Sequence, residues 1–122
     1  MATPLCTLHD LPDNAGRGFV VGADAARQEI FLIRRGSTVY GYRNVCPHKG
    51  TNLDWSPDEF VDESGQYIQC ATHGALFIVE DGLCVQGPCL GASLQPVPIT
   101  VTTEGRVEVE VEVEVEVDVV NA

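Results

Sequence analysis

The segment from Val107 to Asp118 constrains the fold most, because valine and an acidic residue alternate along it without a break. A strict two-residue period places all valines on one face of a strand and all acidic groups on the other. We therefore predict a β-strand over about residues 106–120, with its valines against a core. At about 3.3 Å per residue, fourteen residues extend roughly 46 Å, which exceeds the usual strand of about 3–10 residues. We expect part of this strand to overhang the domain, to fray, or to pair with a second copy in a homodimer.

The acidic face of this segment has two interpretations. Charge on an edge strand keeps it solvated and blocks pairing with other chains. Alternatively, the same face is a docking or dimer surface.

The rest of the chain also favours strands over helices. Short β-branched and aromatic runs, such as residues 29–34 and 38–43, are separated by turns rich in glycine and polar residues. No long window has apolar residues at helical spacing. The 12 glycines and 7 prolines suit turns and strand edges. We predict an all-β fold of short antiparallel strands, and the length of 122 residues predicts a single domain over 1–122.

The charge balance limits the partners. The chain has 18 acidic and 7 basic residues and a net charge of −11, which would repel nucleic acid and anionic membrane surfaces and would suit a basic protein surface. It has no apolar run approaching the roughly 18 residues of a membrane span, and its start lacks the features of an export signal. We expect a soluble cytoplasmic protein that binds neither nucleic acid nor a membrane.

Cysteine and histidine occur together twice, as Cys46-Pro-His48 and as Cys70-Ala-Thr-His73. Each pair follows a predicted strand and precedes a glycine. One such pair could be a nucleophile with its base or a coincidence, but then the second pair has no explanation. Two turns that face each other could present two thiolates and two imidazoles to one metal site. A structural zinc site is compatible with these four ligands, although finger-type sites usually keep both cysteines in one stretch.

The two motifs, C-P-H and C-A-T-H-G, resemble the C-x-H and C-x-x-H signature of Rieske [2Fe–2S] proteins. The flanking "NVCPHKGTNLDW" and "YIQCATHGALF" are similar to the two cluster-binding loops of that family, and the likeness extends from Tyr40 to Pro98. One departure is the spacing of 21 residues between His48 and Cys70, which is longer than usual.

This resemblance implies a Rieske-type fold of antiparallel sheets with a small cluster-binding subdomain over about residues 44–78. It implies one [2Fe–2S] cluster per chain, with Cys46 and Cys70 on one iron and His48 and His73 on the other. Two neutral imidazoles in place of two thiolates make the cluster less negative, so its potential rises into the range of about −150 to +300 mV.

Two further pairs of positions resemble the low-potential, ferredoxin-like branch of the family. High-potential members carry a serine and a tyrosine shortly after the second histidine, where this chain has Ala75 and Phe77. They also link the two loops by a disulfide, at positions that are Thr51 and Thr72 here. Because donors to the cluster sulfurs favour the reduced state, we predict a potential near the low end.

The function implied is one-electron transfer to an oxygenase or reductase partner. A Rieske oxygenase also needs a mononuclear iron held by two histidines and a carboxylate, but only His9 is left. The chain is therefore expected to be an electron-transfer component rather than a stand-alone catalyst. The alternatives are an accessory or redox-sensing subunit of a larger oxidoreductase and a zinc-stabilised binding domain. For Cys84 and Cys89, burial is favoured over a second ligand pair, while Cys6 lies far off in sequence.

Overall fold

The computed structural model describes residues 2–21, 28–47, 53, 60–70, 74–88, 90–110 and 117–118. Within these residues the fold consists of three antiparallel sheets and one short 3-10 helix, η1 (Leu8–Asp10), which confirms the predicted all-β class. No helix among them has the length and apolar character needed to cross a membrane.

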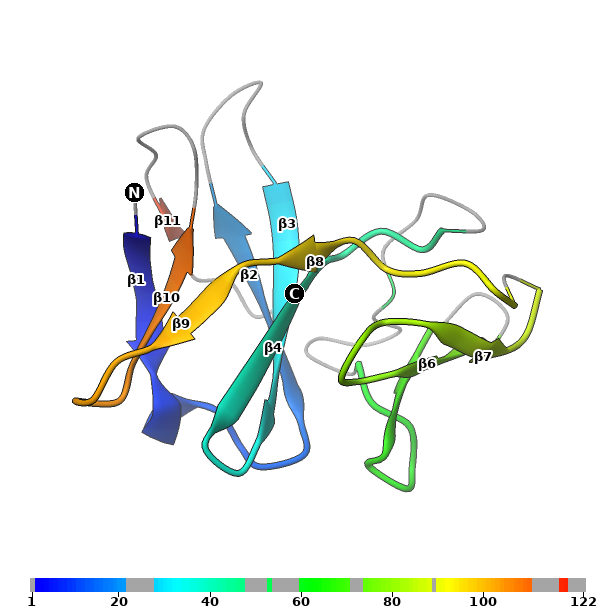
Figure 1. The fold of residues 1–122 in the computed structure, drawn as a ribbon, viewed down its shortest axis with the longest axis horizontal. Helices are drawn as coiled ribbons and strands as arrows, with labels where there is room; N and C mark the ends of the chain where they lie inside the picture. Colours follow the sequence, from blue (N-terminus) through cyan, green and yellow to red (C-terminus); the bar gives the residue numbers. More distant parts are fainter. Residues whose placement is uncertain are drawn as a thin grey trace.

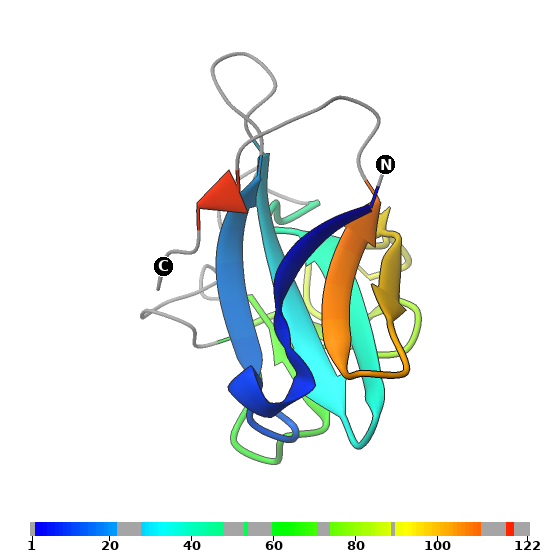
Figure 2. The same ribbon diagram turned by 90° about the vertical axis from the view of Figure 1, so that its left-hand side faces the viewer.

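Sheet A and sheet B form the base of the molecule. Sheet A has the order β1-β10-β9, with β1 Ala2–Thr7, β10 Arg106–Glu110 and β9 Ile99–Val101. Sheet B has the order β11-β2-β3-β4-β8, with β11 Val117–Asp118, β2 Gly16–Val21, β3 Gln28–Arg35, β4 Thr38–Arg43 and β8 Pro96–Val97. Figure 2 shows sheet A packed across one face of sheet B.

Sheet C forms the other end of the molecule. Its order is β5-β6-β7, with β5 Tyr67–Gln69, β6 Leu76–Ile78 and β7 Cys84–Gln86. In Figure 1 it lies on the side of β4 that faces away from sheet A. The predicted subdomain over 44–78 includes β5 and β6, and the structure adds β7 to the same sheet.

Strand β3 shows how the two faces of sheet B are buried in two different hydrophobic cores. Its Ile30, Phe31, Leu32 and Ile33 are all buried. Because side chains alternate across a strand, Ile30 and Leu32 enter the core between sheets A and B, which we call core AB, together with Leu5, Leu11, Phe19, Val21, Val39, Val107 and Val109. Phe31 and Ile33 enter the core on the other face, core BC, together with Tyr42, Cys46, Leu53, Phe60, Ile68, Cys70, Ala75, Phe77, Val79, Cys84 and Leu94.

The Val/acidic segment is divided between two sheets. Val107 and Val109 in β10 are fully buried and Glu108 is more exposed, as the alternation predicts. However, β10 pairs with β1 and β9 in sheet A, whereas β11 pairs with β2 in sheet B. Residues 111–116 and 119–120 lie outside the described residues. The described part is therefore two strands rather than one, and a homodimer through this segment stays a prediction.

Candidate metal centre

The first predicted ligand loop begins where β4 ends. Arg43 and Asn44 are held by the base, because the Arg43 N–H donates to the Gln95 carbonyl and the Asn44 N–H to the Glu29 carbonyl, both at 2.9 Å. Cys46 follows two residues later and is 2% exposed. His48 lies outside the described residues. Sheet pairing thus places the Cys46 thiol at the end of β4 and inside core BC.

Asn44 closes this loop with its side chain. Its Oδ1 accepts a hydrogen bond from the Leu53 N–H at 2.7 Å, across the span that contains Cys46 and His48. Asn44 is 1% exposed, so this polar side chain is buried. The sequence analysis missed this role, and no local pattern could have shown it, because an asparagine after a strand is ordinary in any loop.

The second predicted ligand loop connects β5 to β6. These strands are paired from Tyr67↔Ile78 to Gln69↔Leu76. Beyond that pair, the Cys70 N–H donates to the Ala75 carbonyl at 2.9 Å, and the Gly74 N–H donates to the Cys70 carbonyl at 3.0 Å. Gly74 has a φ of 66°, which side chains with a Cβ rarely adopt. The loop is thus a tight reversal with Cys70, 1% exposed, at its start; His73 lies outside the described residues.

The two loops bring their thiols into one core. Cys46 and Cys70 both belong to core BC, and neither forms a disulfide. They are separated along the chain and joined only by the packing of sheet C on sheet B. Because both histidines lie outside the described residues, the described part contains no group of three metal-binding side chains. Two buried thiols that are not oxidised to a disulfide fit a metal centre that takes two thiolates from two loops.

A third segment packs against the second loop. A Cβ on Gly87 would lie 2.9 Å from both the Cα and the Cβ of Ala75, so the backbone of Gly87 is in close contact with Ala75. The loop is held in place because the Leu90 N–H donates to the Gly87 carbonyl and the Gly91 N–H to the Cys84 carbonyl, both at 3.2 Å. Gly87 therefore packs against the end of the second loop.

Ala75 and Phe77, which indicated a low potential, are both buried in core BC. The side chain of neither residue can donate a hydrogen bond. Thr51 and Thr72, the positions compared with the disulfide of high-potential members, lie outside the described residues. The structure therefore shows two apolar side chains following the second loop.

The remaining cysteines are not brought together as a second ligand set in the described part of the chain. Cys84 is 1% exposed in core BC, and its Sγ donates to the Gln86 carbonyl at 3.3 Å, so its predicted burial is confirmed. Cys89 lies outside the described residues. Cys6 is half-buried in sheet A, and burial, followed by the charge of Asp10, raises the pKa of its thiol to about 11.

Sheet C is fastened to sheet B by two side chains. The Tyr42 hydroxyl donates to the Val79 carbonyl at 2.5 Å. Burial is the main cause that raises the pKa of Tyr42 to about 12, with Asp81 and Glu80 adding to it. Arg35 reaches the Gln66 carbonyl at 2.6 Å and the Glu80 carboxylate at 3.0 Å. These contacts fix the orientation of sheet C, and with it the second loop, relative to the base.

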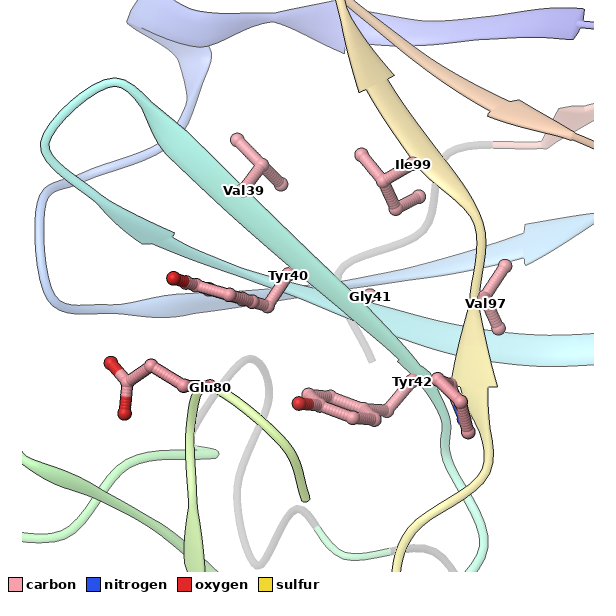
Figure 3. Close-up of a pocket in the computed structure, with 8 residues that line it drawn as sticks. Val39, Tyr40, Gly41, Tyr42, Glu80, Val97 and Ile99 are labelled. Carbon is pink, nitrogen blue, oxygen red and sulfur yellow. The ribbon is translucent and has the colours of Figure 1, made fainter.

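A pocket of about 150 Å³ lies beside this junction, between β4, the β8–β9 segment and Glu80. Figure 3 shows that Tyr40, Tyr42 and Glu80 lie along one side of it and Val97 and Ile99 along the other. None of the described predicted ligands lines it. The pocket belongs to the junction between the sheets, and neither Cys46 nor Cys70 borders it.

Comparison with known proteins identifies relatives of the whole described fold. A model of the Rieske [2Fe-2S] domain matches residues 2–109. The ferredoxin of carbazole 1,9a-dioxygenase from Nocardioides aromaticivorans IC177 is similar in structure, with a TM-score of 0.69 and 22% identity, over 89% of this chain and 96% of that one.

A protein assigned as the small subunit of an NADH-dependent nitrite reductase from Mycobacterium tuberculosis is also similar, with a TM-score of 0.65 and 28% identity, over 93% of this chain and 97% of that one. No curated protein matches.

Proposed function

This chain belongs to the Rieske [2Fe–2S] domain family, and from that premise we propose that it is a ferredoxin-like one-electron carrier that delivers electrons to an oxygenase or reductase. Membership of the family implies one bound [2Fe–2S] cluster, which supplies a reversible one-electron couple. The observation that carries the proposal is the presence of two buried, unbridged thiols, Cys46 and Cys70, in a single core.

The proposed ligands are Cys46 and Cys70 for one iron and His48 and His73 for the other. The described half of this set fits the role. Each thiol is excluded from water by core BC. The Cys70 N–H is bonded to the Ala75 carbonyl, and Cys46 follows Asn44, whose N–H is bonded to Glu29 of sheet B. A thiol held in this way needs little rearrangement to become a ligand, which favours retention of the metal.

The apolar side chains of Ala75 and Phe77 support a low potential within the Rieske range. A donor at either position would stabilise the more negative, reduced state, and neither side chain supplies one. A low potential suits a carrier that passes electrons on to an oxygenase.

A partner would approach beside the second loop, over the uncharged segment of the chain that packs against Ala75. Residues 82–95 contain no acidic or basic residue, although the whole chain has a net charge of −11. Leu90 is 68% exposed in the loop that packs against Ala75, and Val45 is 39% exposed next to Cys46. Apolar side chains in the centre of a contact with charges outside it are typical of protein interfaces.

A second candidate is an accessory or redox-sensing subunit of a larger oxidoreductase. It is favoured by the likeness, at 28% identity, to the protein assigned as a nitrite reductase small subunit. The two candidates share the cluster and differ in whether the chain carries a continuous flow of electrons.

The decisive experiment combines a redox titration with electron transfer to a protein partner. We expect purified protein to contain two irons and two acid-labile sulfides per chain, to have a potential below zero, and to be reoxidised repeatedly by an oxygenase under turnover. A colourless zinc protein would overturn the assignment of the cluster. A chain with the cluster that binds a partner stoichiometrically but supports no turnover would favour the accessory subunit.

A further inference from the structure

We propose that Asn44 is a positioning residue whose side chain holds the first ligand loop closed and thereby keeps the cluster bound. The inference deepens the proposed function, because it concerns the loop that carries Cys46 and His48. It starts from one contact, the hydrogen bond from the Leu53 N–H to Asn44 Oδ1 at 2.7 Å.

The first step concerns what holds Asn44. Its own N–H donates to the Glu29 carbonyl at the start of β3, and the N–H of Arg43 donates to the Gln95 carbonyl before β8. Sheet B therefore fixes the backbone of Asn44 from two sides. The side chain extends from a rigid element, so its oxygen is a fixed acceptor rather than one that follows the loop.

The second step concerns what Asn44 holds. Leu53 is fully buried in core BC, in which Cys46 and Cys70 also lie. A buried backbone N–H that loses its acceptor carries a large desolvation penalty. The Leu53 side chain and the Leu53 N–H therefore fix the far end of the loop together, one through the core and the other through Asn44.

The third step concerns the ligands between these two ends. Cys46 is two residues from Asn44, and His48 lies between Cys46 and Leu53 in the sequence. A ligand loop fixed at both ends has fewer open conformations available, so fewer of its fluctuations separate a ligand from its metal. The second loop has no need of such a side chain, because the pairing of β5 with β6 closes it through the backbone.

The test compares three variants of the intact protein loaded with its cluster. Asn44→Leu preserves the approximate size of the side chain and removes the acceptor, whereas Asn44→Asp preserves an acceptor oxygen. Gln95→Ala is the matched control, since it removes an exposed side-chain hydrogen bond to Arg43 next to the same loop. Two readouts are followed: the rate of cluster loss in the presence of an iron chelator, from visible absorbance, and hydrogen exchange of the peptide that contains Leu53, by mass spectrometry.

We expect Asn44→Leu to lose its cluster roughly tenfold faster and to exchange the Leu53 amide faster by a similar factor, because the buried hydrogen bond from the Leu53 N–H is lost. Asn44→Asp should restore slow exchange and slow loss, and Gln95→Ala should match the wild type. Equal rates of cluster loss in Asn44→Leu and wild type would overturn the inference, as would an Asn44→Asp variant as labile as Asn44→Leu.

A further measurement covers the case in which Asn44→Leu does not fold. In the unmodified protein the Leu53 amide must then exchange far more slowly than amides of exposed loops. Rapid exchange of the Leu53 amide would refute the proposal that Asn44 holds the loop closed. None of these readouts involves a partner protein. Failure of the inference is therefore distinct from failure of the proposed electron delivery.

Discussion

At the scale of single residues, the side chain at position 75 determines whether the end of the second ligand loop can donate a hydrogen bond to the cluster. We predict that Ala75→Ser raises the reduction potential by about 40 mV, since a hydrogen bond of about 1 kcal/mol to the reduced state corresponds to that shift for one electron. Voltammetry of the purified protein measures it. Ala92→Ser is the control, because Ala92 also packs against core BC but lies in another loop. An unchanged reduction potential in Ala75→Ser would show that the side chain at this position does not influence the potential.

The two proposed histidine ligands can be tested together by His48→Cys/His73→Cys. If the doubly substituted chain assembles a cluster, four thiolates make it more negative, and its potential should fall well below that of the wild type. The dependence of the potential on pH that exposed ligating imidazoles cause should also disappear. Redox titration over a range of pH provides both readouts. An unchanged spectrum and potential would show that these histidines are not ligands.

The raised pKa of Tyr42 leads to a prediction about the stability of the protein at high pH. Its pKa is raised from 10.0 to about 12 in the folded protein, so folding favours the neutral phenol. That contribution to stability is complete below pH 10 and is lost as the pH rises to about 12. We expect the free energy of unfolding of the wild type, relative to Tyr42→Phe, to decline over this window. A difference that stays constant up to pH 12 would contradict the role given to the phenol.

Below that window, Tyr42→Phe should lower the free energy of unfolding by about 1–3 kcal/mol, because the Val79 carbonyl loses a buried donor. Chemical denaturation at neutral pH measures this change.

At the scale of elements, the loop after β7 positions the second ligand loop through one close contact. We predict that Gly87→Ala destabilises the protein more than Gly91→Ala does. Both glycines have positive φ, 110° and 88°, so each alanine incurs backbone strain of about 1–2 kcal/mol. Only at Gly87 does the new Cβ also meet Ala75, at 2.9 Å, whereas nothing lies within 4 Å at Gly91. Thermal unfolding and the rate of cluster loss should both show a larger effect for Gly87→Ala than for Gly91→Ala. Equal effects would mean that Ala75 shifts to accommodate the new Cβ at little cost.

Strand β1 shows why one element was missing from the sequence analysis. Its sequence contains Pro4 and has no clean alternation, and proline usually argues against a strand. The structure accommodates it because β1 is an edge strand of sheet A, with an irregularity in its register between Pro4 and Cys6. A proline at an edge removes no required donor. This strand depends on a neighbour, β10, that lies about a hundred residues further along the chain.

At the scale of the whole molecule, the uncharged segment of residues 82–95 beside the second loop is the predicted contact with a protein partner. Leu90→Asp should slow electron transfer to that partner roughly tenfold, because a charge replaces an exposed apolar side chain in the contact. Thr103→Asp adds the same charge on the exposed turn between β9 and β10, at the other end of the molecule, and should have little effect.

Stopped-flow kinetics are measured with the protein partner and with a small-molecule oxidant. The comparison distinguishes an effect on binding of the partner from an effect on the reduction potential of the cluster. Leu90→Asp should be slowed only with the protein partner. Slowing with both oxidants would mean that the substitution has altered the cluster, and no slowing with either would exclude this surface from the contact.

The sequence by itself determined the class of fold and the chemistry of the centre. Strand signals depend only on neighbouring residues, so the β-branched and aromatic runs predicted β3 and β4, and the strict alternation predicted β10 with its valines buried. The pairs Cys46/His48 and Cys70/His73 are likewise local patterns, and they pointed to the family that the comparison with known proteins then showed.

Tertiary structure decided which strands are neighbours and what holds the loops. Alternation shows which face of a strand is buried but not which sheet it joins, so the placement of β10 in sheet A and of β11 in sheet B could not be read from it. Asn44 became a candidate positioning residue only when folding brought the Leu53 N–H to 2.7 Å from its oxygen. The assignment of strands to sheets and the contact of Asn44 with Leu53 both depend on segments that are distant along the chain. The free energy of such contacts is set by burial and pairing in three dimensions.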